Sequence, residues 1–564
     1  MSDPWTSFVD EYVAFHTHDP NHRLHLGLLD GLGRLPDPSL AQEARRCEKA
    51  RELLARMDAL PESDDFEQQL DRDLARLTLE AAVLWSTFTW GGRTTLQREP
   101  RAGDAIGEPL FLLMINDPRR AAARLEDVTA RLEQVPAFLD AMLARLDEPL
   151  ERWRDIDLQT VRGLPSLFST VGAWAEEVAW DGRERLAVAT TSAEQALARY
   201  ADALQALPTT RDLHVGPEIA AQIVRASGIE LSLGELHGIA RDYIASTWSK
   251  MEALRDTLAP EYGLPADVSL AELHRVLNAR HAVAVPDPER LESILEVYEA
   301  ERERIRAFIK ERDLFPLPPQ EDMKILPTPG FLMPQIPAGA MMAPPPLRDG
   351  VPTSVVYLTL TEDRLDSHTE LGIPLMMVHE GIPGHHLQLA WASLHPSPIR
   401  SMYDSPHHAE GWTTMLEDYM QDVGFPIPHE QAARFSGLRD ISRIGARVVI
   451  DLYFMTGDAA YLEIGVEFDR SSDDPFERAG ALLAAVTGFE PARVQGELNW
   501  YSSRRGYPLS YLTGNHLVWA LKADLEAKNG AGIALDRAFH DIYLRSGNMP
   551  LTMVRRVFEQ RGML

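Results

Sequence analysis

The sequence predicts a mostly α-helical protein built as two lobes, with one small β element. Three observations favour this fold class. Apolar residues recur at helical spacing along most of the 564 residues, helix-start signals precede several of these runs, and one stretch has the composition of a strand. The length alone allows about three domains. Large helical proteins can nevertheless form one continuous body, and we expect that arrangement.

Residues 1–315 form the first predicted region, a succession of helices. In a capping box, a serine and a carboxylate or amide three residues later bond the free amides at a helix start. Capping boxes are predicted at Ser39 with Gln42, Ser232 with Glu235, and Ser269 with Glu272. The run LESILEVYEAERERIRAFIKERD, residues 291–313, mixes both charge signs as a long solvated helix does.

The second predicted region, residues 316–564, opens with a proline-rich segment. Eleven prolines lie between Leu314 and Pro352, and proline neither donates a backbone hydrogen bond nor continues a helix. We therefore expect extended, irregular chain there. TSVVYLTL, residues 353–360, predicts a strand because it is rich in β-branched and aromatic residues. Helical patterns then return at residues 409–424, 438–457, 511–530 and 551–562.

The composition argues against several kinds of partner. Lys+Arg 56 against Asp+Glu 85 leaves a net charge of −29, and a surface of that sign repels phosphates. Nucleic acids and anionic membranes are therefore unexpected partners. Cys47 is the only cysteine, which excludes an internal disulfide and a cysteine-based metal cluster. Without a signal-peptide pattern or a long apolar run, we expect a soluble cytoplasmic protein.

The stretch MVHEGIPGHHLQ, residues 377–388, carries the strongest functional signal. Zinc-hydrolase helices commonly contain H-E-x-x-H, but here Pro383 stands where the second histidine belongs. On an unbroken helix, residues six apart point about 240° apart and residues seven apart lie about 10 Å apart. Neither His385 nor His386 could then share a metal ion with His379. Proline predicts a helix break, and looping out two residues would put His385 in the ligand position.

Glu410 is the candidate for a third ligand. Zinc sites of the thermolysin type use two histidines and one glutamate and leave the fourth position open. Glu410 follows His385 by 25 residues, which leaves room for the rest of one helix, a turn and the start of another. Glu417 lies seven residues further on the same helical face. Two other interpretations stay open, namely a histidine-rich surface turn and a first-turn carboxylate favoured by the helix dipole.

Four segments resemble a widespread bacterial family known as domain of unknown function 885. They are HEGIPGHHLQ, EGWTTMLEDY, PLSYLTG and FHDIYLRSGNMPL. The first matches the family motif H-E-x-x-P-G-H-x-x-Q, which looks like a variant of the zinc-peptidase helix. The resemblance covers mainly residues 340–564, and the chain departs from relatives at RGYPLSY and DLYFMTG. The matching positions are His379, Glu380, Pro383, Gly384, His385, Gln388, Glu410, Gly411 and Trp412.

The resemblance implies a metallopeptidase-like helical fold, with the β element beside the metal-binding helix, and one zinc ion (Zn2+) per chain. The implied ligands are His379, His385 and Glu410. The position of His386 can hold tyrosine in relatives, which favours His385 as the ligand. Zinc would lower the pKa of its water towards 7, and Glu380 would accept the proton and return it to the leaving amine.

Further residues are candidates for supporting roles. Tyr511 or Tyr507 could donate a hydrogen bond to a developing oxyanion, although either is also an ordinary core residue. Gln388 and Asp451 could hold a ligand imidazole, or make an ordinary helix hydrogen bond. Four arginines could bind a substrate carboxylate, although each one is more typical of a surface or an ion pair. They are Arg443, Arg447, Arg504 and Arg505.

Together these observations predict a zinc-dependent hydrolase of the peptidase type. It would cleave a peptide or related amide in a cleft between the N-terminal helices and residues 316–564. The strand at residues 353–360 would offer a sheet edge to an extended substrate. An amidohydrolase of a small non-peptide substrate is the first alternative, and a non-catalytic helical binding protein is the second. No phosphate-loop or serine-hydrolase motif lies in a convincing strand–turn–helix context.

Overall fold

The computed structural model describes the chain except residues 1–2, 288, 329–338, 362–364 and 366–367. It is 67% helical with only small sheets, which confirms the mostly α class. The chain divides into two compact units. The first comprises Met1–Val215, Pro345–Asp349 and Ser397–Met402, and the second comprises Gly216–Pro344, Gly350–Pro396 and Tyr403–Leu564.

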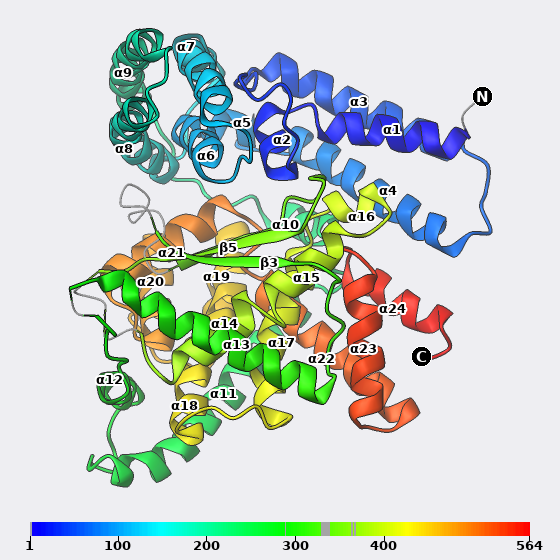
Figure 1. The fold of residues 1–564 in the computed structure, drawn as a ribbon, viewed down its shortest axis with the longest axis vertical. Coiled ribbons are helices and arrows are strands. Elements are labelled where there is room, and N and C mark those ends of the chain that lie inside the picture. Colours follow the sequence, from blue (N-terminus) through cyan, green and yellow to red (C-terminus); the bar gives the residue numbers. More distant parts are fainter. Residues whose placement is uncertain (1–2, 288, 329–338, 362–364, 366–367) are drawn as a thin grey trace. The chain divides into compact units, whose positions relative to one another are not determined.

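The first unit is built of helices that pack in neighbouring pairs (Figure 1). The helix α7 packs along α9, α9 along α8, and α3 along α4. The elements of this unit are α1 (Pro4–His16), α2 (Pro20–Leu26), α3 (Leu40–Asp58), α4 (Phe66–Thr87), β1 (Thr89–Trp90), β2 (Arg93–Thr94), α5 (Thr95–Arg98), α6 (Ala102–Ile115), α7 (Ala121–Arg145), α8 (Glu151–Glu177), α9 (Arg183–Ala206) and α16 (Pro398–Met402).

The second unit holds the remaining helices and a three-stranded sheet. Its elements up to the His motif are α10 (Pro217–Ala226), α11 (Leu233–Glu261), α12 (Leu270–Arg280), η1 (Leu291–Ile294), α13 (Leu295–Arg312), β3 (Asp322–Pro327), β4 (Gly339–Met342), β5 (Thr353–Leu358), α14 (Gly372–Glu380) and α15 (His385–Ser393). They are followed by α17 (Pro406–Asp422), α18 (Glu430–Ile441), α19 (Arg443–Thr456), η3 (Ala459–Leu462), α20 (Pro475–Thr487), α21 (Pro491–Ser503), α22 (Ser510–Asn529), α23 (Ile533–Arg545) and α24 (Leu551–Gln560).

The division between the units lies after Val215, and not at residue 315, where the composition changes. The reason is packing: α11 lies against α18 and α19, so the helices between residues 216 and 312 belong with the C-terminal ones. Most of the proline-rich segment consequently lies inside the second unit.

The predicted helix starts are confirmed. Ser39, Ser232 and Ser269 are the N-caps of α3, α11 and α12, and each side chain accepts a hydrogen bond from the amide three residues later. At Ser232 the reciprocal bond from Glu235 is also present, which completes the capping box. The predicted run at residues 291–313 forms η1 and then α13.

The predicted strand is also confirmed, but its place in the sheet differs from the prediction. The strand β5 pairs in parallel with β3 and antiparallel with β4, so it is the central strand. Its side chains are buried on both faces from Ser354 onward, as befits a central strand. The prediction of a free sheet edge at residues 353–360 was therefore wrong. Part of the proline-rich segment is regular rather than irregular, because β3 and β4 lie in it.

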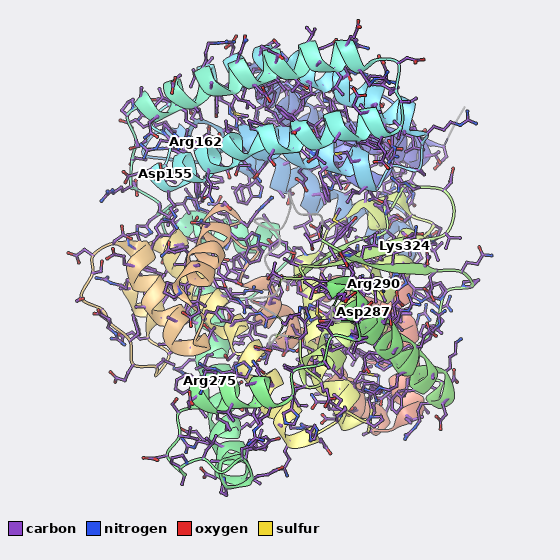
Figure 2. All side chains as sticks on the ribbon, turned by 60° about the vertical axis from the view of Figure 1, so that its left-hand side comes forward. Asp155, Arg162, Arg275, Asp287, Arg290 and Lys324 are labelled. Carbon is purple, nitrogen blue, oxygen red and sulfur yellow. The ribbon has the colours of Figure 1, made fainter. Side chains whose placement is uncertain are left out.

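Charged side chains mark the outer faces of both units. Figure 2 shows Asp155 and Arg162 on α8, Arg275 on α12 and Lys324 on β3, and all four are exposed. Along β3 exposed and buried residues alternate, so Lys324 stands on the solvent face of an edge strand and discourages pairing with another chain. Among the described residues, no helix combines the length and the apolarity that crossing a bilayer requires.

Two glycines let α17 and α22 approach until their backbones touch. A Cβ atom on Gly514 would lie 2.0 Å from the carbonyl oxygen of His407 and 2.8 Å from Cα of Gly411. A Cβ atom on Gly411 would lie 2.4 Å from the carbonyl carbon of Gly514. Glu410 sits at this crossing, so the contact sets its position relative to α22.

We expect Gly514→Ala to lower the free energy of unfolding by about 1–3 kcal/mol, because the new methyl group forces the two backbones apart. Urea denaturation measures the change. Gly496→Ala is the matched control, since Gly496 is an exposed residue of α21 with nothing within 4 Å of an added Cβ. Gly496→Ala should leave the free energy of unfolding unchanged or raise it by up to about 1 kcal/mol. Equal effects of the two substitutions would contradict the proposed contact.

Candidate metal centre

The helix that carries the His motif is interrupted, as predicted. The first part, α14, ends at Glu380, where the amide of Gly381 donates to the carbonyl of Met377. The second part, α15, begins at His385, and the amide of Gln388 closes its first turn on the carbonyl of Gly384. The four residues between the two helices therefore change the direction of the chain.

Gly384 allows this turn because the chain folds back onto the last turn of α14. A Cβ atom on Gly384 would lie 1.9 Å from the carbonyl oxygen of His379, a distance that no side chain tolerates. Trp412 of α17 fastens the turn by donating its indole N–H to the carbonyl of Pro383 at 2.9 Å. As a result the imidazole rings of His379 and His385 lie 4.9 Å apart between centroids and nearly perpendicular.

Three ligand-type atoms converge at this turn, one each from α14, α15 and α17. Oε2 of Glu410 lies 3.7 Å from Nε2 of His379 and 3.4 Å from Nε2 of His385. One ligand atom from each residue lies within 4.8 Å of both others, and all three side chains are largely buried. In a tetrahedral zinc site with bonds of about 2.0–2.1 Å, ligand atoms stand about 3.3 Å apart. Small side-chain shifts would therefore bring them to a common ion.

The hydrogen bonds around the cluster suit a cation at its centre. Nδ1–H of His379 donates to Oε1 of Glu417 at 2.8 Å, which leaves the lone pair of Nε2 facing Glu410. Among the described residues, the buried Oε2 of Glu410 has no hydrogen-bond partner. Two acceptor atoms that face each other in a buried place repel unless a positive charge lies between them. The donor set therefore fits a divalent metal ion.

The charges within the cluster also shift the pKa values of His379 and Glu410 when no metal ion is bound. Burial lowers the pKa of His379, but Glu417, Glu380 and Glu410 outweigh it and raise the pKa to about 9. Burial raises the pKa of Glu410, but the charges of His385 and His379 outweigh it and lower the pKa to about 2. The carboxylate of Glu410 is thus ionised near neutral pH, and an imidazolium can balance it.

Two tyrosines reach the cluster, Tyr507 from the loop before α22 and Tyr511 from the first turn of α22. Tyr507 donates its hydroxyl to Oε1 of Glu410 at 3.3 Å. Tyr511 lies against the same carboxylate, and the guanidinium of Arg447 stacks on its ring at 4.3 Å. Burial and then the charge of Glu410 raise the pKa of both tyrosines well above its usual value. Both hydroxyls therefore stay protonated and can donate hydrogen bonds.

Two candidates on α15 make their contacts away from the cluster. The ring of His386 is fully buried and bonded on both sides, to the hydroxyl of Ser354 at 2.7 Å and to the carboxylate of Glu321 at 2.9 Å. This contact places the β element, through β5, beside α15. Gln388 donates to Oδ1 of Asn548 at 2.6 Å.

Asp451 positions the loop that carries Tyr507. Its carboxylate accepts from the amide of Gly506 at 3.0 Å and from that of Leu509 at 3.3 Å. None of these hydrogen bonds goes to a ligand imidazole, whereas the carboxylate of Glu417 bonds Nδ1 of His379.

Glu380 and the arginines occupy different surroundings. Glu380, at the end of α14, is half-buried and more accessible than the three candidate ligands. Arg447 is buried and engaged with Tyr501 at 3.1 Å and Glu497 at 3.0 Å, so it is not available to a substrate carboxylate. Arg505 is buried, Arg504 is exposed, and Arg443 is half-buried.

The sequence analysis missed the contacts made by Asn548 and Met549, which lie between α23 and α24. Asn548 holds Gln388, and the carbonyl of Met549 accepts from Nδ1 of His408 at 2.9 Å, so this segment braces both α15 and α17. A signal was present, because SGNMPL ends one of the four segments that resemble the family.

The comparisons with known proteins agree with this architecture. Among the solved structures that resemble the chain, two are each described as a "putative lipoprotein". Their sequence identities to this chain are below 20%, so the likeness shows the fold alone. One, of unknown function, is from Shewanella oneidensis, with 17% identity and a TM-score of 0.78 over 99% of this chain and 100% of that one. The other is from Colwellia psychrerythraea, with 16% identity and a TM-score of 0.79 over 100% and 99%.

No curated protein matches the sequence. A family model does match, over residues 20–557, which extends the resemblance seen at residues 340–564 to nearly the whole chain. Its description is bacterial protein of unknown function, and this chain belongs to that family, DUF885.

Proposed function

We propose that this chain is a zinc-dependent hydrolase of the peptidase type, which cleaves a peptide or a related amide bond. The observation that supports it is the buried set of two imidazoles and one carboxylate, His379, His385 and Glu410, whose ligand-type atoms converge. Zinc held there would supply a Lewis acid and the means to activate water near neutral pH.

The chain's own residues would divide the remaining work. Glu417 fixes the tautomer of His379, so that Nε2 faces the cluster. Glu380, half-buried next to His379, would take a proton from the attacking water and return it to the leaving amine. Tyr507 or Tyr511, both protonated, would donate to the carbonyl oxygen as it becomes negative.

The substrate would bind in the second unit. Because β5 is the central strand, an extended substrate would pair with β3 or β4 instead. Arg504 is exposed and lies just before the loop that carries Tyr507. It remains the candidate residue for binding a substrate carboxylate. The acidic net charge of −29 makes nucleic acids and anionic membranes unsuitable partners.

Two alternatives make different predictions. An amidohydrolase of a small substrate would cleave acylated amines regardless of flanking residues, whereas a peptidase would show a sequence preference in a peptide library. A non-catalytic binding protein would cleave neither. The half-buried Glu380 beside the cluster favours catalysis, since a closed structural site has no use for an accessible base.

We expect the purified protein to hold about one zinc ion per chain at low free zinc, and alanine at His379, His385 or Glu410 to remove it, because metal binding needs all three ligands. Elemental analysis after gel filtration measures the content. His386→Gln is the control, since His386 is buried nearby but bonded to Ser354 and Glu321. Unchanged zinc in all three alanine variants would reject the site.

We expect Glu380→Gln to keep its zinc and lose turnover by roughly 10²–10⁴-fold, because glutamine keeps the shape of the side chain but cannot accept a proton. Rates on the best substrate of the peptide library, together with zinc content, test this. A variant that cleaves at the wild-type rate would remove Glu380 from the mechanism. Loss of zinc would make it a ligand instead.

We expect Glu417→Gln to weaken zinc binding by about 10–100-fold, because the carboxylate that orients His379 is replaced by a neutral amide. Competition with a chromophoric chelator measures the affinity. Glu559→Gln removes the same charge from an exposed position on α24 and should leave the affinity unchanged. Equal affinities of the wild type and Glu417→Gln would show that this hydrogen bond does not support the metal centre.

A further inference from the structure

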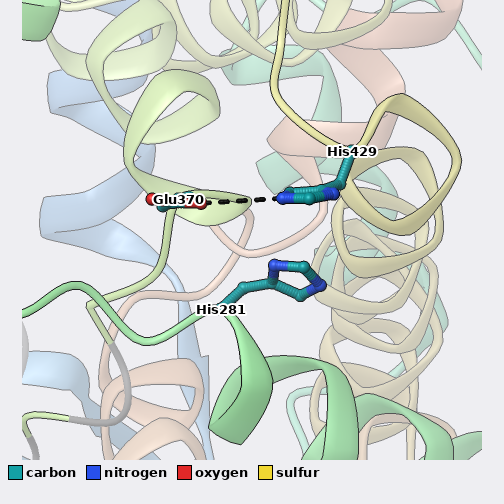
Figure 3. A group of neighbouring side chains, drawn as sticks. All are labelled: His281, Glu370 and His429. Atoms are coloured by element: carbon teal, nitrogen blue, oxygen red, sulfur yellow. Dashed lines mark ion pairs between the residues drawn. The ribbon is translucent and has the colours of Figure 1, made fainter. Parts of the chain in front are cut away.

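A second group of metal-ligand side chains lies in the second unit and shares no residue with the first. It consists of His281 after α12, Glu370 before α14 and His429 before α18 (Figure 3). We propose that these three residues form a second metal-binding site, which takes zinc or a similar divalent transition metal. This inference does not depend on the proposed hydrolase activity.

The geometry brings all three side chains to one point. Ligand atoms of the three residues lie within 4.8 Å of one another. Nε2 of His429 lies 3.7 Å from Oε2 of Glu370, and the rings of His281 and His429 are 4.1 Å apart between centroids. Figure 3 shows the three side chains facing one another from three separate segments. These spacings are like those of the first cluster.

Backbone contacts hold two of the ligands in place independently of any metal. The amide of Glu370 donates to the carbonyl of His281 at 2.9 Å, and Ala282 and Thr369 form an antiparallel bridge. The segments that carry His281 and Glu370 therefore run side by side. His429 has φ +51, and its left-handed backbone, where histidine is better tolerated than most residues, directs the imidazole to the other two.

The surroundings of His281 resemble those of metal-binding histidines. Its Nε2 lies 2.6 Å from the hydroxyl of Tyr262. If Nε2–H donates to this hydroxyl, Nδ1 keeps its lone pair for a metal ion, and ligating histidines commonly donate their other N–H in this way.

The donor types restrict the metal. Two imidazoles and one carboxylate, with no thiolate, suit Zn2+, Ni2+ or Cu2+ better than Ca2+ or Mg2+. The side chains of Glu370 and His429 are 52% and 49% exposed, against 8% and 11% for Glu410 and His379 in the first cluster. Water competes more strongly at the exposed site, so it should fill only after the first site is full.

An ion at this second site would join three segments of the second unit. It would link the end of α12, the chain entering α14 and the start of α18. Because α14 carries His379 and Glu380, such a link would brace the N-terminal end of the helix that leads to the first cluster. The second site is thus placed to stabilise the first through α14.

Equilibrium dialysis against rising free zinc, followed by elemental analysis, tests the proposal. The wild type should bind about one and then about two zinc ions per chain. His429→Asn and Glu370→Gln should each stop at about one, because each removes one ligand. Asparagine tolerates the left-handed backbone at position 429, so this variant should fold. Glu430→Gln and His516→Gln, both at exposed positions, are the matched controls and should reach the wild-type value.

The outcomes separate the two sites. His385→Ala should lose the tight ion and keep the weak one, the reverse of His429→Asn. A wild type that binds one ion, lost in His385→Ala and kept in His429→Asn, would overturn the second site and leave the first intact. A single ion lost in His429→Asn and kept in His385→Ala would support the second site and reject the first. Two ions in both His429→Asn and Glu370→Gln would also overturn the proposal.

Discussion

The close contact between Gly384 and the last turn of α14 is the constraint on which the rest of the metal centre depends. The Cα of Gly384 packs where any Cβ would meet the carbonyl oxygen of His379 at 1.9 Å. This contact lets the chain reverse within four residues and places two histidines, six apart in sequence, side by side. A longer connection could also bring them together, but it would leave their relative orientation loose.

A second close approach brings in the remaining ligand. The backbones of α17 and α22 touch at Gly411 and Gly514, and Glu410 lies next to this crossing. The same crossing brings the hydroxyl of Tyr507 to the carboxylate. Residues from three helices and one loop thus meet because glycines permit backbone contact at two places, and the larger side chains, such as Trp412, then fasten the arrangement.

What the sequence could predict follows from how local each feature is. The N-caps at Ser39, Ser232 and Ser269 act on amides three residues away, and Pro383 acts on its own helix, so these features were visible in the sequence. The partners of Gln388 and Asp451 are 160 and 55 residues distant, and nothing in the local pattern identifies them. For the same reason the central position of β5 was not predictable, since both of its partner strands come from the proline-rich segment.

The indole bond from Trp412 to the carbonyl of Pro383 has a consequence for the entropy of metal capture. A site assembled from mobile loops loses conformational entropy when its ligands are ordered, at about 1–2 kcal/mol per residue fixed. Here the reversing turn is already fastened on one side by the indole and packed on the other against α14. Most of that ordering is completed when the chain folds, so little of the free energy of ligation has to offset it.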